Sequence, residues 1–215
     1  MAHPYWPLYD LEVRTPHLTL RYIDEELSVE LARLAATGVH DPAFMPFMIA
    51  WTDLPSPQLE RGAMQFHWRT RAETAPASWR IGFATIVDGT VVGSTDLSAT
   101  GFPALRQFET GSWLGREYQG QGIGKEMRLA SLTLGFDGLG AMFATTAAWT
   151  DNAPSIGVTR SLGYAETGPV RGLRRGEAGE QLHFRMSAEH FAAIRRPDIE
   201  ITAIDPVREF LDIQG

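Results

Sequence analysis

The chain of 215 residues contains no cysteine, which excludes disulfide bonds, thiolate metal sites and a cysteine nucleophile. It also has no run approaching 18 apolar residues, so we expect no membrane partner. Its N-terminus lacks a basic segment followed by an apolar one, which is the pattern of a secretory signal. These absences place the expected compartment in the cytoplasm.

Basic residues are in the minority, and the formal net charge of −7 argues against nucleic acid as a partner. Apolar residues make up 44% and charged residues 21%, which is ordinary for a globular protein. The length suits one domain with a full core. We expect a domain over residues 1–187 and a C-terminal tail, residues 188–215, that packs on the domain or on a partner subunit.

Hydrophobic periodicity predicts an α/β (α+β) architecture, with strands and helices around a mixed sheet. Asp24 precedes an amphipathic stretch with Leu27 and Leu31 on one face, which predicts a helix that ends at Gly38. Asp88-Gly89 separates two strand-like segments and predicts a hairpin. The other expected strands are 11–23, 108–114, 141–149, 164–167 and 181–186, and the other expected helices are 58–73, 125–137 and 154–162.

A glycine-rich loop between an expected strand and an expected helix predicts an anion site. Glycines let successive backbone N–H groups converge, and the helix N-terminus adds its dipole. Lys125 is followed by Glu126, which excludes a P-loop, and the third glycine of a dinucleotide fingerprint is missing. The loop consists of Gln119, Gly120, Gln121, Gly122, Ile123, Gly124 and Lys125.

This loop resembles the coenzyme A loop of the GCN5-related N-acetyltransferase (GNAT) superfamily. Residues 109–119 before it resemble the branch of the RimJ/RimL ribosomal-protein N-acetyltransferases. Residues 151–164 resemble that branch's second motif, with Asn152, Ser155 and a Leu-Gly-Tyr ending. The resemblance covers residues 11–187, and it implies a mixed sheet of about seven strands that splays to admit CoA.

By this resemblance, Ser112, Trp113 and Leu114 would offer backbone hydrogen bonds to the pantetheine arm. Residues 119–125 would bind the pyrophosphate, and Asn152 and Ser155 would also contact the cofactor. The alternative for Asn152 and Ser155 is a helix cap. The expected co-substrate is acetyl-CoA or another acyl-CoA such as succinyl-CoA, with no metal.

The implied reaction is direct attack of a primary amine on the thioester, the amine belonging to a protein N-terminus or a small molecule. Glu109 is the first candidate for the general base, although it could equally be a surface carboxylate, and Asp96 is the second. Thr159 stands where many members of the family carry a tyrosine, so Ser155 or a water is the expected acid.

The acceptor is the least determined part of the prediction. Trp51 and Trp68 lie in the segment that usually walls the acceptor cleft, and core packing is the alternative for both. Arg171 and Arg174, expected in a loop between the last two strands, would bind an acidic group such as a succinyl carboxylate, or would simply be solvated. A noncatalytic acyl-CoA sensor is the second function class. A homodimer or higher homo-oligomer is expected by analogy alone.

Overall fold

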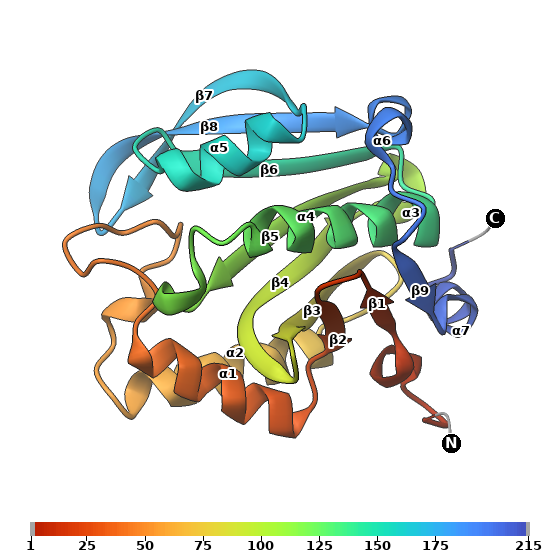
Figure 1. Ribbon diagram of the computed structural model, residues 1–215, viewed down its shortest axis with the longest axis horizontal. Helices are drawn as coiled ribbons and strands as arrows, with labels where there is room; N and C mark the ends of the chain where they lie inside the picture. The colour runs from red at the N-terminus through yellow and green to blue at the C-terminus, as the bar shows by residue number, and fades with distance from the viewer. Residues whose placement is uncertain (1–2, 214–215) are drawn as a thin grey trace.

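The computed structural model describes residues 3–213 and contains a mixed sheet of nine strands in the order β7-β8-β6-β5-β4-β3-β2-β1-β9 (Figure 1). The expected count of seven was too low. The segment expected as one strand at 11–23 is a hairpin of two, and the C-terminal segment adds a ninth. The strands are β1 (Glu12–Arg14), β2 (Thr19–Tyr22), β3 (Ser78–Val87), β4 (Thr90–Thr100), β5 (Gln107–Leu114), β6 (Phe143–Trp149), β7 (Ala165–Arg174), β8 (Glu177–Ser187) and β9 (Glu200–Thr202).

The helices begin and end near the residues that the sequence indicates. The Asp24 side chain accepts a hydrogen bond from the Leu27 backbone N–H over 2.8 Å and so caps α1, which ends at Gly38. The helix expected at 125–137 begins earlier, at Ile123, and closes in a π-helical turn. The α-helices are α1 (Glu25–Thr37), α2 (Gln58–Ala72), α3 (Phe102–Leu105), α4 (Ile123–Thr133), α5 (Ala153–Ser161), α6 (Ala188–Ile194) and α7 (Ile204–Phe210).

The hairpin predicted at Asp88-Gly89 is confirmed. Both residues have positive φ, 48° and 78°, which is the backbone geometry of the tight turns that match strand twist. The pairing of β3 with β4 then shifts by one residue, because Thr85 lies opposite Gly93 while Ile86 lies opposite Val91. This bulge decides which side chains of the hairpin share a face.

Helices cover the two faces of the central sheet (Figure 1). Helices α1 and α2 pack together and lie on one face, where the α1 core includes Ala84 of β3. Helix α4 lies on the other face, where the Ser131 hydroxyl contacts that of Thr95 on β4 over 3.1 Å. Side chains alternate along a strand, so neighbouring strand residues serve opposite sides of the sheet.

The sheet opens between β5 and β6, its only parallel neighbours within residues 3–213. Their pairing ends at Glu109–Thr145, after three residue pairs, and β6 continues alongside β8 instead. In an antiparallel ladder, alternate residues bond to one neighbour. The Gly115 N–H donates to the Val92 carbonyl of β4, so the backbone N–H and C=O of Trp113, two residues earlier, also face β4. The backbone groups of Ser112 and Leu114 face the opening instead.

The described part of the C-terminal segment, residues 188–213, is folded against the rest of the chain. Strand β9 pairs antiparallel with β1, and α7 packs beside the N-terminal 3-10 helix Pro7–Asp10. Phe191, Val207 and Leu211 are buried in the same core as the central strands. Residues 214 and 215 of the expected tail, and residues 1 and 2 of the expected domain, lie outside the described residues. None of the helices within 3–213 is long and apolar enough to cross a membrane.

Candidate active site

The glycine loop connects the 3-10 helix Arg116–Tyr118 to α4, as its sequence predicted. Gly120 and Gly122 have φ of 74° and 86°, a region that other residues enter only with strain. Gly122 is the N-cap of α4, so the N–H groups of Ile123 and Gly124 have no carbonyl one turn earlier to bond. These amides and Lys125 form a cradle of donors that suits an anion.

The Gln119 side chain holds the glycine loop in position. Its side-chain amide donates to the carbonyls of Val39 over 2.7 Å and Leu114 over 2.9 Å. These bonds tie the loop to the end of β5 and to the segment after α1. The side chain therefore shapes the cradle, and its amide hydrogens are directed away from a ligand in it.

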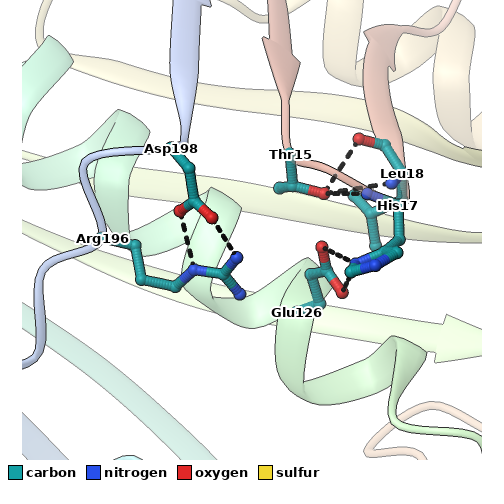
Figure 2. A network of polar contacts seen from close by, with 6 residues as sticks. All are labelled: Thr15, His17, Leu18, Glu126, Arg196 and Asp198. Carbon is teal, nitrogen blue, oxygen red and sulfur yellow. Dashed lines mark hydrogen bonds and ion pairs between the residues drawn. The ribbon is translucent and has the colours of Figure 1, made fainter.

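A polar network fixes the first turn of α4 (Figure 2). Both carboxylate oxygens of Glu126 lie 3.2 Å from Nδ1 of His17, which belongs to the turn between β1 and β2. Partial burial raises the pKa of Glu126, but contacts with Thr15 and His17 and the charge of Arg196 outweigh it and lower the pKa. The carboxylate thus stays charged near the positive end of the helix dipole. Arg196 pairs with Asp198 beside it (Figure 2).

Asn152 and Ser155 lie at the start of α5, directly after β6. The Asn152 side chain is the N-cap and accepts the Ser155 backbone N–H over 3.3 Å. The capping alternative is therefore present in the structure, and both side chains stay partly exposed. Thr159, where a tyrosine is common in the family, is buried and donates its hydroxyl to the Ser155 carbonyl over 2.9 Å.

A cavity of about 540 Å³ lies on the α1 and α2 face, opposite α4. Gly111, Ser112 and Trp113 of β5 form one wall, and Asp96 of β4, Arg80 of β3 and Arg69 of α2 contribute charged groups. The other lining side chains are mostly apolar or aromatic and include Leu31, Phe47, Ile49, Leu54, Leu59 and Phe66. Residues of β5 therefore line this cavity. The backbone N–H and C=O groups of alternate β5 residues face the β5–β6 opening.

Asp96 is the carboxylate of this cavity. Its Oδ1 accepts a hydrogen bond from Arg80 Nη1 over 2.5 Å, and its Oδ2 lies where a side chain at Gly111 would begin. Burial raises the pKa of Asp96 to about 6; the charge of Arg80 opposes the rise, and the charge of Glu109 adds to it. At neutral pH this carboxylate is ionised and close to the range in which it can accept a proton.

Glu109 is exposed and lies in a second cavity, of about 490 Å³, rather than beside Asp96. Arg80 and Thr70 line both cavities, which therefore adjoin, and the charge of Glu109 still acts on Asp96. Both positions predicted for a base thus lie on the α1 and α2 face. They differ in burial, and the more buried one is Asp96.

The two tryptophans predicted for the acceptor have different surroundings. Trp51 lines the large cavity, with its ring centroid 5.7 Å from that of Trp113 and 5.3 Å from that of Phe47. Trp68 is 46% exposed on α2 and donates its indole N–H to Glu25 over 3.0 Å. It is not among the residues that line the cavity.

His67 lines the large cavity and also links two helices. Its Nδ1 lies 2.9 Å from the Ser28 hydroxyl, which joins α2 to α1. Burial lowers the pKa of His67 to about 4, with the charge of Arg71 acting in the same direction. The imidazole is therefore neutral at physiological pH.

The arginines expected in a loop are placed differently by the structure. Arg171 and Arg174 lie in β7, because β7 and β8 extend as a long hairpin whose turn includes Arg175. Arg174 forms a bidentate ion pair with Asp151, with two contacts of 2.8 Å. The Arg175 guanidinium pairs with Asp53 and ties the hairpin to the segment that carries Trp51.

Sequence reasoning missed the side chains of Arg80, Arg128, Phe47 and Phe66. Arg80 carried a signal, since an arginine across a hairpin from an aspartate is a common ion pair, although the bulge hides the register. The aromatic rings carried none beyond their composition. Within the described range 3–213, no group of three or more histidines, aspartates and glutamates could hold a metal ion.

Comparisons with known proteins agree with this architecture. A structure of RimL, a ribosomal L7/L12 α-N-protein acetyltransferase in complex with coenzyme A, has a TM-score of 0.68 at 17% identity, covering 80% of this chain and 95% of that chain. A GCN5-related N-acetyltransferase from Brucella melitensis has a TM-score of 0.68 at 19% identity, with coverages of 86% and 81%. A spermidine N-acetyltransferase chimera from Vibrio cholerae and hSSAT has a TM-score of 0.65 at 14% identity, with coverages of 82% and 98%.

At these identities the likeness shows the fold. The family comes from a sequence profile described as "Acetyltransferase (GNAT) domain", which matches residues 17–165, more than half of the chain. The chain belongs to the GNAT acetyltransferase family.

Proposed function

We propose that the chain is an acyl-CoA-dependent N-acyltransferase, most simply an N-acetyltransferase, that transfers the acyl group directly to a primary amine in the cytoplasm. One observation carries the proposal. The cofactor cradle and the β5–β6 opening lead to residues 111–113 of β5, and the cavity with an ionisable carboxylate meets the same residues from the other face. A thioester carbonyl at that point would be reachable from the cavity.

The residues of the cofactor side fit CoA. The loop amides after Gly122 and the ammonium group of Lys125 would hold the pyrophosphate. Ser112 and Leu114 would hydrogen bond the pantetheine arm through their backbone, and Asn152 would contact it while capping α5. Bound acyl-CoA supplies an activated carbonyl carbon and a thiolate leaving group.

Asp96 is our proposed general base. An α-amine has a pKa of about 7.7–8.0, so most of it is ammonium at pH 7 and about a tenth is neutral. A carboxylate with a pKa near 6 could take the proton from the ammonium form or from the amine as it attacks. Arg80 holds the carboxylate toward Gly111, where the attacking nitrogen would pass. Glu109, in the neighbouring cavity, would attract a positively charged acceptor toward it.

The proton for the departing thiolate would come from Ser155 or from a water. The Thr159 hydroxyl is turned into its own helix and donates to a carbonyl there, so it does not replace the family tyrosine. The Ser155 hydroxyl is at the exposed start of α5, beside the opening.

The cavity favours an acceptor amine that carries an apolar or aromatic body. Its wall includes the rings of Phe47, Trp51 and Phe66, which would pack against such a body, while Asp96 would contact the amine. The names of similar structures include acceptors of two kinds, a ribosomal protein N-terminus and spermidine. We propose that a small amine or a protein N-terminus with a hydrophobic first side chain is the better fit.

The test is release of free thiol from acetyl-CoA and from succinyl-CoA, across a panel of amines and N-terminal peptides. We expect turnover with at least one acceptor, and we expect it to fall in the Asp96→Asn variant. Binding of CoA without thiol release on any acceptor would contradict the proposal and support the alternative, a noncatalytic acyl-CoA sensor. Sedimentation at several concentrations tests the proposed homo-oligomer.

A further inference from the structure

Arg128 is a buried arginine with unused hydrogen-bond donors. It lies on α4 and is 5% exposed, and its Nη2 contacts the Ser112 hydroxyl over 3.4 Å. Its Nε and Nη1 make no hydrogen bond with any described residue. A buried charge without a partner is costly, and such groups are usually matched by an anion.

Two buried hydroxyl groups lie beside this guanidinium. Thr110 Oγ1 on β5 and Tyr164 Oη, just before β7, also lack a partner at normal hydrogen-bond distance within residues 3–213. Burial raises the pKa of Tyr164, while the charge of Arg128 and the proximity of Thr110 lower it, which places the three groups together. Two N–H groups and two hydroxyls without a hydrogen-bond partner thus lie close together in the interior.

This cluster, Thr110, Arg128 and Tyr164, lies at the deep end of the β5–β6 opening. Thr110 is the first residue of β5 after its last pair with β6, Glu109–Thr145. Arg128 is five residues into α4, about 8 Å along its axis from the glycine loop. With the pyrophosphate at the loop, the cluster would face the acyl end of the cofactor rather than its phosphates, a step that rests on the proposed function.

Arg171, which was also predicted to bind an acidic group, is exposed on β7, and three other arginines are already paired. Both terminal nitrogens of Arg174 bond to Asp151, Arg175 bonds to Asp53, and Arg80 bonds to Asp96. Arg128 differs from these three because no described carboxylate pairs with it. A carboxylate can accept from a guanidinium and from hydroxyls at the same time, which is the set of donors that the cluster offers.

We propose that Arg128, together with Thr110 and Tyr164, binds the terminal carboxylate of a short dicarboxylic acyl group on CoA. The preferred donor would then be a dicarboxylic acyl-CoA such as succinyl-CoA. The reaction itself is unchanged: the amine nitrogen bonds to the thioester carbon, the carbon–sulfur bond breaks, and the thiolate takes up a proton. The distal carboxylate takes no part and only selects the donor.

The test is calorimetric binding of succinyl-CoA and of butyryl-CoA, which has a chain of the same length without the carboxylate. We expect the wild type to bind succinyl-CoA tighter by about tenfold or more, as a buried charge-assisted hydrogen bond would give. In Arg128→Met this ratio should fall to near one, while butyryl-CoA binds as before. Tyr164→Phe, which removes one hydroxyl, should reduce the ratio by a smaller factor.

A wild type that prefers butyryl-CoA, or a preference for succinyl-CoA that survives Arg128→Met, would overturn the inference. Failure of CoA and both thioesters to bind would instead overturn the proposed function. Binding of free succinate, measured with and without CoA, distinguishes a site for the acyl carboxylate from a general anion site. Succinate that binds equally well with and without CoA would indicate a general anion site and would contradict the proposal.

Two controls keep the test interpretable. Arg195→Met removes the same charge from an exposed pair with Asp137 and should leave the donor ratio unchanged. Removing an unpaired buried charge seldom destabilises a protein, so Arg128→Met should unfold at a temperature equal to or above that of the wild type. If Arg128 is kept for ligand binding at some cost in stability, the unfolding temperature of the variant should rise. If Arg128 is needed for folding, the unfolding temperature should fall.

Discussion

Arg80 donates a hydrogen bond to Asp96 over 2.5 Å, and this ion pair joins two neighbouring strands at the wall of the large cavity. It holds a carboxylate against Gly111, the one position of β5 at which no side chain intervenes. The pair leaves the carboxylate with a raised pKa of about 6, because burial outweighs the attraction of Arg80. The geometry thus supplies a proton acceptor fixed in place rather than a free surface carboxylate.

The first prediction compares the two candidate bases. Asp96→Asn keeps an oxygen for Arg80 but cannot accept a proton, and we expect kcat/KM to fall by about a hundredfold or more. Glu109→Gln should cost less than about tenfold, because Glu109 is exposed in the neighbouring cavity. Steady-state thiol release across pH 5–9 measures both. In the wild type, kcat/KM should fall as the pH drops through about 6, and this step should be absent in Asp96→Asn.

Equal losses in the two variants would contradict this assignment, as would a pH profile that Asp96→Asn leaves unchanged. Thermal unfolding at pH 7 is the control. Asn at position 96 removes a charge that burial disfavours, so the variant should be no less stable than the wild type.

The pairing of Arg80 with Asp96 shows what could not be read from the sequence. The Asp88-Gly89 turn was recognised, and continuing the pairing of Ile86 with Val91 without a shift would place Asp96 opposite Ile81, leaving Arg80 on the other face. The bulge at Val92 moves the register by one residue and brings Arg80 and Asp96 to the same face. Nothing local in the sequence marks this extra residue.

The glycine loop could be predicted because its conformation depends on local backbone geometry. Positive φ at Gly120 and Gly122 calls for glycine, and the helix start follows at once. The cavity could not be predicted in the same way, because Phe47, Trp51 and Phe66 meet only through tertiary packing. The length of β7 was missed for a similar reason: its glycine and arginine residues give no alternating pattern, and pairing with β8 supplies the order.

The second prediction concerns stability against pH. His67 has a pKa lowered from 6.5 to about 4, so the unfolded chain binds the proton more tightly. Its contribution to stability is therefore present above about pH 6.5 and is lost as the pH falls toward 4, by up to about 3 kcal/mol. Asp96 acts in the opposite direction, because its pKa is raised from 3.8 to about 6 and stability is lost as the pH rises between these values.

The contributions of these two groups should nearly cancel between pH 4 and 6. In chemical denaturation, the stability of His67→Gln relative to the wild type should therefore fall as the pH rises through this range, and that of Asp96→Asn should rise. Gln at position 67 can still bond to Ser28, which limits other changes. Slopes of the same sign in both variants would contradict the prediction.

The third prediction tests the cofactor cradle with a matched pair of glycines. Gly122→Ala and Gly89→Ala each place a side chain at positive φ, 86° and 78°, with no atom within 4 Å of the new carbon. Both should lose about 1 kcal/mol of stability through backbone strain. Only Gly122→Ala should also weaken CoA binding, by about tenfold or more, because it turns the loop amides. Calorimetry with CoA decides, and equal affinities in the two variants would argue against a cradle at this loop.

The fourth prediction separates the two tryptophans. Trp51→Ala removes a ring from the cavity wall, so the KM for the acceptor should rise by about tenfold or more with CoA affinity unchanged. Trp68→Ala breaks an exposed contact between α2 and Glu25 of α1 and should leave the acceptor KM within about twofold. Kinetics at saturating acyl-CoA measure both. A larger effect from Trp68 would place the acceptor over the outer face of α2 instead.

The fifth prediction concerns the ion pair between Arg175 and Asp53. It connects the tip of the β7–β8 hairpin to the 3-10 turn Trp51–Asp53, and Arg175 also donates to the Pro42 carbonyl over 3.1 Å. Because the pair is exposed, Arg175→Ala should leave the melting temperature nearly unchanged. The variant should still raise the KM for the acceptor, because the turn that carries Trp51 loses its ion pair with the hairpin. The affinity for CoA should stay the same. Asp53→Ala should have the same effect, and the double variant should add nothing further.

Arg195→Ala breaks a comparable exposed pair away from the cavity and should leave KM unchanged. An additive double variant would mean that the two residues act separately, and the hairpin would then have no part in positioning the cavity wall.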